Sequence, residues 1–155
     1  MSGIYLLLAL FSQFSSANFL ASVASAPAQV YISFDQANGL GVGAPVVVEG
    51  EVVGSVTNVS VPSEPQVQPY KLNVEISVKP EHRERLKLGT VALAFSPLSS
   101  DKKKSDTVLE LFVPRANGNT LLADGSLIRG YSSYEQFWSA GGSDFRLHPD
   151  SLFKS

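Results

Sequence analysis

The side chains that could act as metal ligands are few and scattered along the sequence. The two histidines are His82, in the charged run EHRER, and His148, in the tail RLHPD. A zinc site in a protein needs three or four ligands at characteristic spacings, and neither histidine has a second ligand at such a spacing nearby. The sequence therefore predicts no metal site, and both histidines are expected to be exposed.

The carboxylates and serines form no catalytic pattern either. Glu75 and Glu110 lie inside strand-like segments, on the face opposite the apolar one, and such positions usually face solvent. General acid–base catalysis would require the two carboxylates to meet in one cleft. Ser96, Ser99 and Ser100 lie in no G-x-S-x-G sequence and beside no histidine. The sequence therefore predicts a protein that is not an enzyme.

Binding of a cofactor or of nucleic acid also lacks support. No G-x-G-x-x-G turn opens a helix, and no lysine follows a phosphate-binding glycine loop. The net charge is −2, whereas domains that bind nucleic acid usually carry a basic excess. The chain has no cysteine, which excludes disulfides and thiolate metal sites and leaves its compartment open. We expect no cofactor and no nucleic-acid partner.

The N-terminal part of the chain is a separate compositional segment, because Asp35 is its first charged residue. Residues 4–11 are apolar throughout, while residues 12–24 mix Ser, Gln and Asn with apolar side chains. As one helix, residues 4–24 would span about 31 Å, enough to cross the hydrocarbon core of a bilayer. The favoured interpretation of residues 1–26 is a hydrophobic helix that forms a membrane anchor, whose polar side chains would face other helices.

Two alternatives compete with a membrane anchor. Ala24, Ser25 and Ala26 offer a small-residue cleavage site for a signal peptide, but Pro27 follows and no basic residue precedes the apolar run. A helix buried against protein would explain the polar half of the segment. Since basic residues are missing, positive charges do not orient the anchor.

Beyond a short linker, the sequence becomes strand-like and continues so for about a hundred residues. Apolar and polar side chains alternate in most of the segments, as in YKLNVEISVK at 70–79. The candidate strands lie at 30–34, 45–50, 51–61, 70–79, 90–96, 107–113 and 119–130. They predict an all-β domain at 28–130, a small, closed or nearly closed antiparallel barrel of about seven strands. A helical turn is expected at Glu81–Leu88 and a short helix at Tyr131–Ala140, within a C-terminal region at 131–155.

The glycines are expected to shape turns and not to hold a ligand. The pair Asp124-Gly125, between apolar flanks, predicts a β-hairpin. The glycines expected to serve structural turns are Gly39, Gly43, Gly50, Gly54 and Gly125.

A long polar connection joins two apolar strand candidates. Residues 96–107 carry three lysines against two aspartates, and long connections in compact domains are often functional. Taken alone, the lysine run is most simply a solvated hairpin tip.

The stretch FDQANGLGVGAPVVVEGEVVGSVTNV resembles the signature of the MCE domain family. The matching residues occur in the family's order: Phe34, Gly39, Leu40, Gly43, Val46, Gly50, Val53 and Gly54. The resemblance continues to about residue 130. GIYLLLALF looks like the start of the N-terminal anchor of single-domain members of the MlaD type, and SSYEQFW looks like the helix after their barrel.

This resemblance implies a seven-stranded barrel that forms a homohexameric ring around a central pore. It further implies a single N-terminal span in an inner membrane, with the barrel on the periplasmic side. An ABC permease and ATPase would be the partners, and a phospholipid or another hydrophobic molecule the cargo. Two alternatives stay open: a structural or accessory subunit of another membrane complex, and a secreted monomeric barrel that binds a ligand.

In the family, the hairpin between the last barrel strands lines the pore, which implies a lipid path along residues 96–107. Here the hairpin has no glycine, a departure from the MlaD type. Its lysines would form a cationic ring that favours anionic groups, or would point into solvent while aromatic side chains line the pore. The candidate lining residues are Pro97, Leu98, Lys102, Lys103, Lys104, Phe137 and Trp138.

Overall fold

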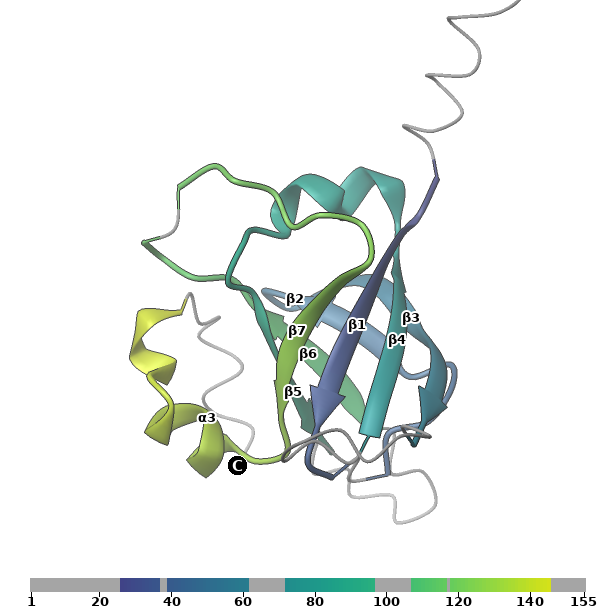
Figure 1. Cartoon of the computed structure of the whole chain (residues 1–155), viewed down its shortest axis with the longest axis vertical. Coiled ribbons are helices and arrows are strands. Elements are labelled where there is room, and N and C mark those ends of the chain that lie inside the picture. Colours follow the sequence, from purple (N-terminus) through teal and green to yellow (C-terminus); the bar gives the residue numbers. More distant parts are fainter. Residues whose placement is uncertain (1–25, 37–38, 62–71, 97–106, 117, 146–155) are drawn as a thin grey trace, which may run out of the picture.

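The computed structural model of the chain describes residues 26–36, 39–61, 72–96, 107–116 and 118–145 (Figure 1). Nearly all of the expected anchor at 1–26 therefore lies outside the described residues. Seven strands are present in the described part: β1 (Ala28–Phe34), β2 (Pro45–Val48), β3 (Glu51–Ser60), β4 (Leu72–Val78), β5 (Val91–Phe95), β6 (Val108–Phe112) and β7 (Ser126–Tyr131). They close into a barrel in the order β1-β4-β3-β2-β6-β5-β7. The predicted closed barrel is confirmed.

The barrel is mixed, so the prediction of a purely antiparallel sheet is wrong. Strands β1 and β4, β3 and β4, β2 and β3, and β5 and β6 pair antiparallel. Strand β7 runs parallel to both β1 and β5, and β2 runs parallel to β6. Parallel neighbours need a crossover connection, and alternation within a strand carries no information on which strand it will pair with.

Apolar side chains fill the barrel interior. Successive side chains of a strand point to opposite faces, and the inward set of β1 consists of Val30, Ile32 and Phe34, all almost completely buried. Strand β4 contributes Val74 and Ile76 in the same way. Small barrels of this kind are filled by their own side chains.

Two glycines illustrate how the strands come this close. Glu49 and Gly50, at φ 50° and 83°, form the two-residue turn between β2 and β3, which fits the preference of hairpin turns for positive φ. Gly54 lies inside β3, where a Cβ atom would stand 2.0 Å from the carbonyl oxygen of Ser77. The barrel thus needs glycine at this crossing of β3 and β4, because any side chain would collide with the β4 backbone.

The pair Asp124-Gly125 does not form the predicted hairpin. Leu121 bridges to Lys87, and only Ser126–Tyr131 continues as a strand. Asp124 Oδ1 accepts a hydrogen bond of 2.6 Å from the backbone N–H of Gln29, and the N–H of Gly125 donates to the carbonyl of Gln29 at 2.7 Å. The turn therefore attaches the start of β7 to the start of β1. The apolar residues before it pair elsewhere, which the local sequence does not reveal.

Short helical elements complete the fold. The 3-10 helix η1 (Pro80–Arg85) confirms the helical turn expected after the fourth strand. The predicted C-terminal helix is confirmed as α3 (Tyr134–Ser139), shorter than expected because Tyr131 still belongs to β7. Its N-cap is Ser133, whose side chain accepts from the N–H of Gln136, and a second 3-10 helix, η2 (Gly142–Asp144), follows. Figure 1 shows α3 beside the barrel wall.

Candidate functional site

The barrel has two distinct ends. At the first, here called the N-terminal end, β1 begins next to the end of β4, with Ala28 opposite Val78. At the second, here called the loop end, Phe34 pairs with Leu72. Since β7 runs parallel to both β1 and β5, strand β5 also finishes at the loop end. In Figure 1 strand β1 starts at the top, at the N-terminal end, and runs down to the loop end.

The residues expected to line a pore hairpin lie outside the described part of the chain: Pro97, Leu98, Lys102, Lys103 and Lys104. The base of this connection is described. Ser96 Oγ and Thr107 Oγ1 are 3.0 Å apart, within hydrogen-bonding distance, and Thr107 is buried. The connection therefore leaves and re-enters the barrel at the loop end.

A glycine-rich turn lies against this base. A pocket of about 440 Å³ is formed by residues 39–45 together with Thr107. Gly39 comes so close that a Cβ atom there would stand 3.4 Å from Thr107 Oγ1. The turn presents Val42, which is 70% exposed, and Val61 at the end of β3 is 71% exposed. The loop end thus carries apolar surface.

Sequence reasoning missed Val42 and Val61 as candidate residues. A signal for Val42 existed, because it stands between two glycines in GLGVG. Leu40, in the same turn, is buried in the core, so the spacing of the glycines does not by itself tell which apolar side chain of the turn faces outward.

Phe137 and Trp138, the aromatic candidates, lie on α3 in different environments. Phe137 is 1% exposed and stacks on Phe112 with ring centroids 4.5 Å apart. Tyr131 and Phe145 also pack against its ring. Phe137 therefore holds α3 on the outer face of the barrel, while Trp138, at 42% exposure, presents surface to the outside.

The prediction of a solvent-facing Glu110 is wrong. Its side chain is buried, at 4% exposure, two residues before Phe112 on the outer face of β6. Helix α3 covers this face, so a position that alternation assigns to solvent becomes buried. Burial raises the pKa of Tyr134 on α3, and the negative charge of Glu110 raises it further.

Glu75 and Glu110 do not meet in a cleft. Glu75 is half-buried on β4, and the barrel order leaves β3 and β2 between β4 and β6 on one side and β1, β7 and β5 on the other. The two carboxylates therefore belong to distant parts of the wall. Within the described residues, no group of three potential metal ligands occurs.

His82, expected to be exposed, is half-buried at the N-terminal end. Its Nε2 lies 3.8 Å from Glu51 Oε1. Arg85 pairs with Glu51 and, at 3.4 Å, with Glu49, and it donates to the carbonyl oxygen of Val48 at 3.2 Å. These contacts attach η1 to the β2–β3 hairpin and bury part of the histidine. His148 lies outside the described residues.

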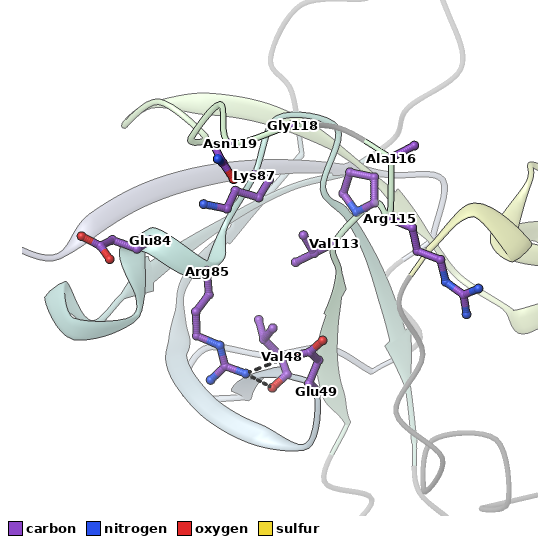
Figure 2. Close-up of a pocket in the computed structure, with 11 residues that line it drawn as sticks. Val48, Glu49, Glu84, Arg85, Lys87, Val113, Arg115, Ala116, Gly118 and Asn119 are labelled. Atoms are coloured by element: carbon purple, nitrogen blue, oxygen red, sulfur yellow. Dashed lines mark hydrogen bonds and ion pairs between the residues drawn. The ribbon is translucent and has the colours of Figure 1, made fainter.

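A second pocket, of about 360 Å³, adjoins this ion-pair cluster. Figure 2 shows Arg85 reaching toward Glu49 and Val48, with Lys87 and Arg115 on other walls. Arg115 Nε donates to the carbonyl oxygen of Phe145 at 2.9 Å. The pocket has both acidic and basic side chains on its walls, and it lies between η1, the hairpin and the connection after β6.

None of the helices in the described ranges has the length and apolar character needed to cross a membrane.

Comparisons with known proteins agree on the barrel. A family model described as "MlaD protein" matches residues 26–105. Among solved structures, one chain of the Acinetobacter MlaFEDB complex in an ATP-bound conformation is similar, with 14% sequence identity and a TM-score of 0.50. The match covers 90% of this chain and 99% of that chain. At this identity the likeness shows the fold alone. No curated protein matches the chain.

Proposed function

Because the chain belongs to the MlaD protein family, we propose that it is a subunit of a phospholipid-transport system of the cell envelope. In this proposal, copies of the chain form a homohexameric ring, and the cargo passes through the ring. The family match over residues 26–105 is the observation that carries the proposal.

The packed interior of the barrel supports an assembly. Since valine, isoleucine and phenylalanine side chains fill the interior, a lipid has no route through a single barrel. A shielded apolar path must then lie between copies, where hydrophobic cargo avoids water. In this proposal the protein's role is to form the apolar path. This role needs no catalytic residues, and the sequence has no catalytic pattern.

An exposed apolar pair on the wall also supports an assembly. Tyr31 and Leu127 are directly paired across β1 and β7, and they are 37% and 67% exposed. Exposed apolar side chains grouped in this way are typical of surfaces that contact another protein. We assign this patch to contact between neighbouring copies.

The energy for transport would come from another subunit, and the membrane anchor from the N-terminal residues of this chain. The similar solved chain belongs to a complex in an ATP-bound conformation, and this sequence has no phosphate-binding glycine loop. We therefore propose an ABC permease and an ATPase as partners. Residues 1–26 would anchor the ring in the inner membrane, with the barrels on the periplasmic side.

The loop end would face the lipid path. It carries Val42 and Val61 and the base of the connection at 96–107. Pro97, Leu98 and the lysines at 102–104 would extend this surface, joined by Trp138 on α3. The cationic side chains would favour anionic groups of the cargo.

Photo-crosslinking tests this assignment. A photoreactive amino acid is placed at Val42, at Leu98 or, as the control, at Leu88, which is 56% exposed and lies after η1 at the other end of the barrel. The full-length chain is then illuminated in its native membrane. We expect phospholipid adducts at Val42 and Leu98 well above those at Leu88. Equal labelling at all three positions, or labelling of Leu88 alone, would contradict a lipid path at the loop end.

A further inference from the structure

A third pocket lies where the loop end meets α3. It has a volume of about 570 Å³, and the side chains on its walls include Asp35, Arg129, Tyr131, Glu135 and Gln136. Two carboxylates and one guanidinium group thus surround one space. Neither the apolar turn at 39–43 nor the ion-pair cluster at Arg85 takes part in it.

The walls of this pocket are held by backbone contacts. Asp35 directly follows the last residue of β1, and the β1–β7 register places Ser33 opposite Arg129. Ser132 Oγ donates a hydrogen bond of 2.7 Å to the carbonyl oxygen of Gln36. The chain after β1 and the chain before α3 are therefore joined, which fixes the pocket's width.

Asp35 carries the strongest sign of a missing ligand. Its Oδ1 atom is buried and has no hydrogen-bond partner among the described residues. Nearly all buried polar atoms of proteins have a partner, and a buried carboxylate oxygen without a donor destabilises the fold. Since Asp35 lines the pocket, a donor group that enters the pocket would satisfy the atom.

A positive charge on the neighbouring strand is held in place. The guanidinium carbon of Arg129 lies 5.0 Å from the ring centroid of Tyr131, within the range of a cation–π interaction. Guanidinium groups bind phosphate in a bidentate manner. The pocket can therefore receive a negative group at Arg129 and a positive one at Asp35 and Glu135.

We propose that this pocket binds a zwitterionic group that carries a primary ammonium and a phosphate, as in the phosphoethanolamine headgroup of a phospholipid. The ammonium N–H groups donate to Asp35, and Arg129 donates to the phosphate. A trimethylammonium group, as in phosphocholine, has no N–H and leaves Asp35 Oδ1 unsatisfied. The lipid source of the headgroup rests on the proposed function, while free phosphoethanolamine offers the same chemistry.

The test compares headgroups on the purified full-length chain in detergent. In one arm, calorimetry measures the affinity of soluble O-phosphoethanolamine against phosphocholine. In the other, native mass spectrometry measures retention of phosphatidylethanolamine against phosphatidylcholine from an equimolar mixture. We expect a preference for the primary ammonium of about tenfold, the range of a hydrogen bond to a charged group.

Asp35→Ala should abolish the preference, because alanine has no oxygen that could accept the ammonium N–H. Glu81→Ala, an exposed change on η1 at the other end of the barrel, is the control and should retain it. A series of mono-, di- and trimethylated headgroups on the wild-type chain needs no variant. There the preference should persist as long as one N–H remains and should be lost with the third methyl group.

Preference in both arms supports the lipid headgroup, and preference in the soluble arm alone supports the pocket with a free ligand. Equal affinities along the methylation series, or a preference that survives Asp35→Ala, would overturn the proposal. The soluble arm tests the pocket even if the chain carries no lipid. A ring that carries lipid, with no headgroup preference in either arm, would contradict this inference and leave the proposed function standing.

Discussion

At the residue scale, Gly54 is needed because strands β3 and β4 approach each other closely there. The sequence alone marks this glycine only as a turn former. Gly54 lies in the middle of β3, and the carbonyl of Ser77 occupies the space of its missing side chain. The glycines that match the family signature therefore have two roles: most form turns, and Gly54 lets two strands cross closely. Only at the strand crossing is every side chain excluded for steric reasons.

Substitution of this glycine should be costly. Gly54→Ala places a methyl group 2.0 Å from a backbone oxygen, and we expect it to lower the free energy of unfolding by about 1–3 kcal/mol or more. Gly41→Ala is the matched control, because a Cβ atom there meets nothing within 4 Å. Urea denaturation of both variants checks the difference, and equal stabilities would show that β3 can move away from β4.

Tyr134 predicts a loss of stability at alkaline pH. Burial first, and then the charge of Glu110, raise its pKa above the usual value near 10. In the unfolded chain the phenol ionises at its ordinary pKa, so above that pH the unfolded state binds fewer protons than the folded one and stability falls as pH rises. Thermal unfolding at pH 9 to 11.5 should show a smaller decline in Tyr134→Phe than in the wild type. Identical declines would contradict this assignment.

At the element scale, α3 determines which outer positions of the barrel are buried. Alternation along β6 correctly separates inside from outside, but it cannot indicate that a helix far along the chain covers the outside. For this reason the sequence assigns Glu110 to solvent and marks Phe137 only as a candidate lining residue. The burial of both side chains depends on the docking of α3.

The strands themselves were largely predictable from the sequence, because most combine period-two alternation with glycine or proline near their ends, and the others are short apolar runs. Their pairing was not. The turn at Asp124-Gly125 has the composition of a hairpin, yet its partners are Gln29 and, just before it, Lys87. Local sequence specifies the turn, and distant segments specify what it joins.

The candidate site was predictable in part. The connection at 96–107 stands out by length and charge, and its base does lie at one end of the barrel. The Asp35 pocket was not foreseen, because the residues that form it are about a hundred positions apart in the sequence and meet only through the β1–β7 pairing.

Removal of the ring of Phe137 should detach α3. This side chain is fully buried between Phe112, Tyr131 and Phe145, and Phe137→Ala should cost about 3–5 kcal/mol of unfolding free energy. Trp138→Ala, next along the helix and partly exposed, should cost clearly less. Hydrogen exchange of the α3 amides measures the detachment, and unchanged protection in Phe137→Ala would show that other contacts hold the helix.

At the scale of the whole molecule, the barrel is a packed body with two different ends. The N-terminal end receives the chain from residues 1–26 and is braced by the contacts of Arg85. The loop end combines apolar turn residues with a pocket of mixed charge. The proposed function assigns the first end to the membrane side and the second to the lipid cargo.

The interior of each barrel is filled, so the proposed function places the path for lipid between copies. This proposal therefore requires both assembly and lipid binding. The most direct measurement is the native mass of the full-length chain extracted from its membrane in mild detergent, with the bound lipid identified after release. We predict a hexamer that retains phospholipid. A monomer that carries no lipid would contradict the proposed function.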